Sequence, residues 1–362
     1  MFRIAYALNK LRTDFFLSGV SDRFRSGKMV PPPSYVLWDC SRRCNLRCAH
    51  CGATKEKYAA ELTTGQIRRT IDELAAMKVR MFAVTGGEPL LRTDCLDVLA
   101  YARTRGLKTG MATNGFLLDE AAADRIREAG VYSVQISLDG TEPTHNRIRG
   151  NPRSFEKAVQ AVERLLRRRV PVLSVATTVT PQNLGELDAM RGLLSQLGVS
   201  MWRLTVVMPI GRAEAADLSL DAGQMEGLFA FVRDHRRGSP RIYLGENLTY
   251  LGEWETRLRS GPVICPVGYL ACCIGVDGHV RGCPEQPDTA ENREGSILES
   301  PFAEIWRGGF GRYRQRQILA TDPDCSACGW KDDCFGGCWV MRTGNRQCIR
   351  RLLQAGRALP AG

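Results

Sequence analysis

The hydrophobic and polar positions of residues 34–210 alternate between two periods. Short apolar runs rich in β-branched residues predict six strands, at 35–39, 81–85, 108–113, 131–137, 172–179 and 201–207. Amphipathic stretches between them predict helices, at 64–77, 95–105, 119–128, 154–168 and 184–197. Strands that alternate with helices in this way are typical of βαβ units. The sequence therefore predicts an α/β fold, a partial (β/α)6 barrel of the TIM type.

The same pattern divides the chain into four parts. Residues 1–33 form an N-terminal basic extension with a short helix at 4–16, and residues 34–210 form the barrel. Residues 211–260 form a helical linker with one helix at 221–235. Residues 261–362 are loop-rich and hold nine of the fourteen cysteines. We expect a small second domain there, whose stability depends on bound metal more than on a large core.

Three cysteines follow the first predicted strand with the spacing C-x3-C-x2-C, at Cys44, Cys48 and Cys51. A structural zinc ion requires four ligands, so three thiolates do not complete its site. Three thiolates do suit a cubane iron–sulfur cluster that keeps one iron open for a substrate or cofactor. Cys40 lies outside this spacing, and we expect a buried thiol near a strand end.

With Asn45 after the first cysteine and His50 before the last, this motif resembles that of the radical S-adenosylmethionine enzymes. The resemblance implies a [4Fe–4S] cluster on Cys44, Cys48 and Cys51, whose open iron binds the amino and carboxylate groups of S-adenosylmethionine (SAM). Reductive cleavage of SAM would give a 5′-deoxyadenosyl radical, which removes a hydrogen atom from substrate.

Other predicted strand ends carry residues that the resemblance assigns to SAM. The segment Gly86-Gly87-Glu88-Pro89 matches the one that contacts the methionine amino group. Asn114 and Ser137 are implied cofactor contacts, and an arginine could pair with the cofactor carboxylate; of Arg147 and Arg149 we favour Arg149. Asp139 could instead cap a turn. In parallel α/β barrels such residues meet at the carboxyl edge of the strands.

The C-terminal cysteines resemble a SPASM domain, which binds two auxiliary [4Fe–4S] clusters. The implied ligands of the first cluster are Cys265, Cys272 or Cys273, Cys283 and Cys338, and those of the second are Cys325, Cys328, Cys334 and Cys348. If neither Cys272 nor Cys273 binds, the first auxiliary cluster keeps an open iron. Cys325-x2-Cys328 alone would suit zinc equally well, but the x5 and x3 spacings that follow favour clusters.

Composition limits the partners and the compartment. Clustered cysteines indicate metal binding in a reducing compartment. The net charge of +11 is scattered, which favours a solvated basic surface over a dedicated acidic site, although a flavodoxin or ferredoxin reductant would be attracted. There is no basic stripe interleaved with aromatics, as nucleic-acid binding requires, and no apolar run of transmembrane length. We expect a cytoplasmic protein that binds neither nucleic acid nor membrane.

These features predict a radical SAM/SPASM enzyme that oxidatively modifies a ribosomally synthesised peptide or protein. The product would be a crosslink, dehydrogenation, epimerisation or decarboxylation. No leader-binding domain is evident at the N-terminus, so a separate recognition protein is an expected partner. One alternative is a tetrapyrrole or other small-molecule substrate, because residues 144–147 also resemble haem-pathway enzymes. The other is a non-catalytic electron carrier or zinc scaffold.

Overall fold

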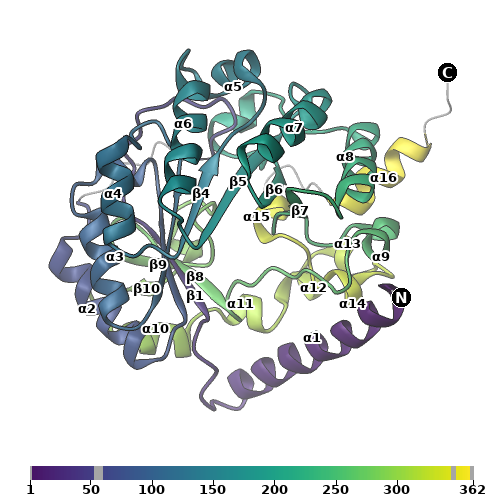
Figure 1. The fold of residues 1–362 in the computed structure, drawn as a ribbon. Coiled ribbons are helices and arrows are strands. Elements are labelled where there is room, and N and C mark those ends of the chain that lie inside the picture. The colour runs from purple at the N-terminus through teal and green to yellow at the C-terminus, as the bar shows by residue number, and fades with distance from the viewer. Residues whose placement is uncertain (1, 53–59, 344–347, 359–362) are drawn as a thin grey trace.

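A single ten-stranded sheet organises the chain, which a computed structural model describes for residues 2–52, 60–343 and 348–358 (Figure 1). The strand order is β10-β9-β8-β1-β2-β3-β4-β5-β6-β7, and neighbours from β8 through β1 to β7 are parallel. The strands are β1 (Tyr35–Asp39), β2 (Met81–Thr85), β3 (Lys108–Thr113), β4 (Ser133–Ser137), β5 (Val172–Val179), β6 (Met201–Val206), β7 (Arg241–Leu244), β8 (Ala271–Ile274), β9 (His279–Arg281) and β10 (Arg293–Ser296). The six predicted strands, and with them the partial α/β barrel, are confirmed.

Helices cover the outer face of this sheet (Figure 1). The long helices of the chain are α1 (Phe2–Arg25), α2 (Thr64–Ala76), α3 (Cys95–Thr104), α4 (Glu120–Glu128), α5 (Glu142–Arg149), α6 (Ser154–Arg167), α7 (Leu187–Leu197), α8 (Ala222–His235) and α16 (Ile349–Ala358). Of these, α1 lies along the C-terminal third and α16 packs on α8 (Figure 1). Capping boxes begin α2 at Thr63 and α8 at Asp221, where side chain and backbone satisfy each other's hydrogen bonds. The predicted helices are found, and α5 is an addition.

Within the described residues, the C-terminal third has seven shorter α-helices besides its strands. These are α9 (Glu255–Leu258), α10 (Phe302–Gly308), α11 (Gly311–Arg314), α12 (Gln317–Thr321), α13 (Pro323–Ser326), α14 (Lys331–Cys334) and α15 (Trp339–Thr343). Helices of four or five residues have few internal hydrogen bonds, so their stability comes from what they pack against. The cysteine-rich part of the chain is therefore loop-rich, as predicted.

One hydrophobic core runs through the barrel and into the C-terminal third. Trp38, Phe82 and Trp202 are completely buried around the sheet, and the rings of Trp38 and Phe82 lie 6.3 Å apart. Phe302 of α10 belongs to the same core. Burial of each such side chain contributes roughly 2–3 kcal/mol, which fixes the sheet that carries the site.

Three segments differ in extent from the prediction. The predicted helical linker also contains β7, which continues the barrel beside β6, and the C-terminal part contributes β8, which pairs with β1. Strands of four residues give too few positions for an alternating pattern to be recognised. The N-terminal helix extends to Arg25, because its first strong terminator is Gly27, with φ +66°.

In the described part of the chain, no helix combines the length and the apolar character needed to cross a membrane.

Candidate functional site

The cysteine loop leaves the carboxyl end of β1 and packs against the turn after β2. Gly87 N donates to Ser41 O at 2.6 Å, and Glu88 N donates to Arg43 O at 2.8 Å. A Cβ on Gly87 would lie 2.2 Å from Arg43 O, so this approach requires glycine. On the loop, Cys44 is exposed, Cys48 buried and Cys51 half-buried.

Glu88 is completely buried, and its carboxylate joins the turn after β2 to the end of β3. It accepts hydrogen bonds from Thr113 Oγ1 at 2.7 Å, Asn114 N at 2.9 Å and Leu90 N at 3.1 Å. Burial raises the pKa of Glu88, and these donors oppose the rise. The described contacts give Glu88 a role in holding the turn, and its contact with SAM stays a prediction.

Asn114, at the end of β3, reaches the cysteine loop. Its Nδ2 donates to Asn45 Oδ1 at 2.8 Å and lies 3.9 Å from Cys44 Sγ, while its Oδ1 accepts from Phe116 N. Ser137 ends β4, half-buried, at the same carboxyl edge. Both residues thus lie where the sequence placed them.

Asp139, just beyond β4, is the hub of a buried ion-pair network. Its Oδ2 accepts from His50 Nε2 at 2.8 Å and from Arg149 Nη2 at 2.6 Å, and its Oδ1 accepts from Thr178 N. Burial opposes its ionisation, but Arg149 and His50 outweigh burial and hold the pKa of Asp139 far below its usual range. Asp139 is therefore a buried, charged residue that holds His50, Arg149 and the backbone of β5 together, and it is not a turn cap.

Arg149, the last residue of α5, connects this network to the loop. Its Nη1 lies 3.7 Å from Cys48 Sγ. Burial lowers the pKa of Arg149, but Asp139 and Cys48 outweigh burial, so the pKa is raised overall. Arg147 is exposed and bonds to Thr144 and Gln182 instead. Of the two arginines, the structure places the preferred one against the cysteines.

His145 is a site residue that sequence reasoning missed. Its Nδ1 accepts from Asp139 N at 2.9 Å, and burial, followed by Arg149, lowers its pKa to about 3. The imidazole is therefore neutral and supports the loop that carries Asp139. The sequence signal that could have revealed it is H-x3-R on one helix, four residues being one helical turn.

The residues around the loop fit an anionic three-thiolate cluster. Two buried donors beside it, Arg149 Nε and Asn45 Nδ2, have no hydrogen-bond partner among the described residues and can donate to a bound group. Cys40 is fully buried, and an interaction with Cys95 raises its pKa, followed by burial. The prediction of a buried Cys40 is confirmed. A [4Fe–4S] cluster here would supply the electron that cleaves SAM.

Three cysteines of the C-terminal third form a second group. Burial raises the pKa of Cys338 to about 12, and Cys265 raises it further. Burial also raises the pKa of Cys283, with Glu285, Cys338 and Cys265 acting in the same direction. Cys265 and Cys338 thus both disfavour ionisation of the Cys283 thiol, and a metal would have to deprotonate the three thiols on binding.

Four further cysteines line one cavity, which Cys338 of the second group also borders, together with Trp330 and Arg350: Cys325, Cys328, Cys334 and Cys348. Burial raises the pKa of Cys334 to about 12, and Cys348 and Cys325 add to the rise. Arg350 Nη1 donates to Cys328 Sγ at 2.7 Å. The structure brings together the four residues that the resemblance to a SPASM domain assigned to one cluster.

Cys272 and Cys273 lie side by side in β8, opposite Val36 and Leu37 of β1. Burial raises the pKa of both thiols, and the next strongest influence is Cys273 for Cys272 and Arg281 for Cys273. After burial, the strongest influences thus come from Cys273 and Arg314 on Cys272, and from Arg281 and Asp39 on Cys273. Ligation by either thiol therefore stays a prediction.

Glu285 lies between the cysteine loop and the second cysteine group. It follows Cys283 by two residues, and its Oε2 would lie 2.7 Å from a Cβ on Gly52, the residue after Cys51. Burial raises the pKa of Glu285, whereas Arg42 and Arg203 oppose the rise most strongly. The two cysteine sites therefore share one polar region.

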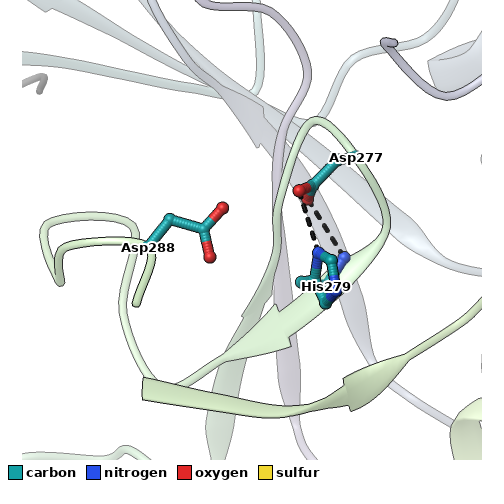
Figure 2. A group of neighbouring side chains, drawn as sticks. All are labelled: Asp277, His279 and Asp288. Atoms are coloured by element: carbon teal, nitrogen blue, oxygen red, sulfur yellow. Dashed lines mark hydrogen bonds and ion pairs between the residues drawn. The ribbon is translucent and has the colours of Figure 1, made fainter. Parts of the chain in front are cut away.

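A separate group of Asp277, His279 and Asp288 lies around the β8–β9 hairpin, where His279 Nδ1 bonds to Asp277 Oδ2 at 2.8 Å (Figure 2). Arg293 occupies a place between the carboxylates, with Nε 2.7 Å from Asp288 Oδ1 and Nη2 3.9 Å from Asp277 Oδ2. This arginine pairs with both acids, so the group is explained as an ion-pair network that holds the hairpin.

Comparison with known proteins agrees with this site. Residues 38–194 match the model of the radical SAM superfamily. The chain is 30% identical over 332 residues to the pre-heme d1 synthase of Dinoroseobacter shibae, covering 84% of this chain and 81% of the relative. It is 29% identical over 328 residues to the mycofactocin maturase MftC of Mycobacterium tuberculosis, covering 89% and 81%.

Among solved structures, Streptococcus suis SuiB bound to its precursor peptide SuiA matches with a TM-score of 0.72 at 14% identity, covering 88% of this chain and 74% of SuiB. At this identity the likeness concerns the fold. The chain belongs to the radical SAM superfamily. It is accordingly an enzyme that uses a [4Fe–4S] cluster and SAM.

Proposed function

We propose that this radical SAM enzyme binds its cluster through Cys44, Cys48 and Cys51 and binds SAM beside the ends of β2, β3 and β4. Gly86, Gly87, Glu88, Asn114, Ser137 and Arg149 are the proposed SAM contacts. Arg149 and Asn45 support this assignment, because each holds a buried donor without a partner in the described residues. The residues of the chain would orient the cofactor and hold the loop in place, with the charged pair of Asp139 and Arg149 beside it.

The C-terminal cysteines would hold two auxiliary clusters. Cys325, Cys328, Cys334 and Cys348 are proposed for one, because they line a common cavity. Cys265, Cys283 and Cys338 are proposed for the other, because their thiols interact with one another. Because the strongest influences on Cys272 and Cys273 come from groups other than these three thiols, we favour the alternative in which this cluster has three cysteine ligands and one open iron.

A net two-electron oxidation of substrate is the proposed reaction class. The observation that carries it is Glu285, which touches Gly52 beside the first site and interacts with Cys283 and Cys338 at the second. An electron acceptor at the second site would thus lie beside the region where hydrogen is removed. Removal of a hydrogen atom, then of one electron and one proton, yields a new bond or a double bond.

The proposed substrate is a ribosomally synthesised peptide or protein, as the name of the mycofactocin maturase relative suggests. A flavodoxin or ferredoxin would supply electrons, and a separate protein could recognise the peptide. The second candidate is a carboxylated tetrapyrrole, as the pre-heme d1 synthase relative suggests. The observation in its favour is the positive charge that Arg42, Arg203 and Arg281 bring to the polar region, where Asp39 pairs with Arg42 and Arg281 and Glu246 pairs with Arg203.

Anaerobic reconstitution followed by reduction in the presence of SAM tests these proposals. Three clusters predict about twelve iron atoms per chain and release of 5′-deoxyadenosine. Synthetic peptides encoded beside the gene and a tetracarboxylate porphyrin would be compared as substrates in deuterated buffer. A peptide that stimulates cleavage and changes mass supports the maturase; stimulation by the porphyrin alone overturns it in favour of the tetrapyrrole. Absence of any cleavage by fully loaded protein contradicts the catalytic assignment itself.

A further inference from the structure

The segment after β6, which the sequence suggested was only the beginning of a linker, is bound to the cysteine loop. Arg212 N donates to Cys51 O at 3.0 Å, and Arg212 Nε donates to Cys48 O at 2.9 Å. One half-buried arginine thereby holds the main-chain carbonyls of two cysteines of the C-x3-C-x2-C motif.

Close packing around Arg212 leaves this contact little freedom. Gly211 has φ +61°, and a Cβ there would lie 2.8 Å from the carbonyl carbon of Gly52 and 3.0 Å from Cys51 O. On the other side, a Cβ on Gly52 would meet Ile210 Cδ1 at 3.0 Å. The two glycines allow the two backbones to touch, so the position of Arg212 relative to the loop is fixed by main-chain contact.

Arg212 also brings a positive charge to the loop, and it does so from a different element than Arg149. Arg149 approaches Cys48 Sγ from α5, where Asp139 pairs with its guanidinium. For Arg212, the described residues provide no salt bridge to a carboxylate within 4.0 Å, so its charge is not offset locally in that way. A cation beside an iron–sulfur cluster stabilises the more negative, reduced state.

We propose that Arg212 is a positioning residue for the cluster-binding loop: it fixes the carbonyls of Cys48 and Cys51, and its charge raises the reduction potential of the cluster that cleaves SAM. This inference rests on the proposed placement of that cluster on Cys44, Cys48 and Cys51. It assigns a function to a segment outside the family motif that identified the loop.

A redox titration of the reconstituted full-length protein tests the proposal. The signal to follow is the component of the reduced EPR spectrum that changes when SAM is added, because the proposed SAM site lies at the cluster on Cys44, Cys48 and Cys51. In Arg212→Gln, we expect a tenfold lower ratio of reduced to oxidised cluster at a given potential, equivalent to about 60 mV for a one-electron couple. Arg212→Lys keeps the charge and should restore most of the shift.

Arg191→Gln is the matched control, because Arg191 is also partly exposed but lies on α7, paired with Asp188. A potential of Arg212→Gln equal to that of this control would overturn the proposal. If Arg212→Gln retains no SAM-sensitive cluster, the Arg212→Lys variant decides. A SAM-sensitive cluster at the wild-type level in Arg212→Lys supports the proposal, and loss of the cluster in Arg212→Lys as well overturns it. A wild-type protein without any SAM-sensitive signal would instead contradict the proposed cluster site.

Discussion

The cysteine loop of the barrel and the cysteines of the C-terminal third are positioned in different ways. The loop carries its three cysteines within residues 44–51, and side chains or backbone from the ends of β2, β3, β4 and β6 bind it. The C-terminal cysteines are spread from residue 265 to residue 348, on strands, loops and helices of four or five residues.

This difference indicates which of the two sites is preorganised, with its cysteines in place before metal binds. In the barrel, hydrogen bonds and buried ion pairs place the thiols, so the chain bears the cost of bringing them together. In the C-terminal third, cysteines that are distant in sequence form the groups, and metal–thiolate bonds would contribute folding free energy directly. We therefore expect the cysteine loop to keep its conformation when no metal is bound. The folded structure of the segment around residues 323–343 should depend on bound metal.

The largest expected effect is on the barrel site. Cys48→Ala should reduce SAM cleavage at least about 1000-fold. The proposed cluster is held by three thiolates only, one on each of three irons, and loss of one of them should prevent its binding. Iron should fall by about four atoms per chain, with the C-terminal clusters retained. Anaerobic 5′-deoxyadenosine assays and iron analysis measure both. Cys95→Ala is the control, since Cys95 is buried against Cys40; normal cleavage by Cys48→Ala would contradict the site.

Removal of iron by a chelator should distinguish the two regions most directly. Amides of residues 323–343 should exchange about 1000-fold faster in the apoprotein, because opening would no longer break metal–thiolate bonds. Amides of β3 and α2 should change less than about threefold, since the shared hydrophobic core holds them. Hydrogen exchange with mass spectrometry reads both. Equal acceleration in the two regions would remove the distinction drawn between them.

Much of the barrel site could be predicted because each of its parts is local in sequence. The C-x3-C-x2-C spacing and the Gly86–Glu88 turn each follow a recognisable strand. The network of Asp139, His50 and Arg149 could not be predicted, because only the folded sheet brings the loop after β1 beside α5. Arg212 was missed for the same reason, and the four-residue strands β7 and β8 lack a periodic signal of their own.

Single cysteine substitutions sharpen the picture of the C-terminal third. Cys283→Ala should cost about four iron atoms per chain, because Cys283 interacts with both Cys265 and Cys338. Cys272→Ala and Cys273→Ala should each leave iron unchanged, because their thiols interact with other groups. Iron analysis and Mössbauer spectra of the three variants decide the matter. Loss of a cluster in either of the latter two would identify the fourth ligand.

The neutral His145 should make the barrel, but not the C-terminal third, sensitive to mild acid. Its pKa of about 3 in the folded chain lies below the ordinary value of 6.5. Between these values only the unfolded chain binds the proton at this residue, so the contribution of His145 to stability falls by about 2 kcal/mol as pH falls from 7 to 5. Asp39, whose pKa burial raises to about 6, contributes in the opposite direction. In His145→Asn, the amide oxygen can accept from Asp139 N, and the contribution of residue 145 should disappear, so the difference between wild type and variant isolates it. Urea unfolding followed by fluorescence at the two pH values measures it; an unchanged slope would contradict the neutral buried imidazole.

The smallest effect concerns Asn114, and it separates support of the loop from contact with SAM. Asn114→Asp keeps the oxygen that accepts from Phe116 N but removes the Nδ2 donor to Asn45 and adds a negative charge 3.9 Å from Cys44 Sγ, where the lost donor stood. If Asn114 contacts SAM, the dissociation constant for SAM should rise about tenfold, the equivalent of one hydrogen bond, with iron unchanged. Asn114→Ser is the uncharged control.

Because Gly87 and Arg212 still fix the loop by hydrogen bonds to its main chain, loss of one side-chain donor should not cause loss of the cluster. Reduced iron with unaltered SAM affinity in the loaded fraction would make Asn114 a support of the loop, and the barrel site would then depend on side chains more than its backbone contacts suggest.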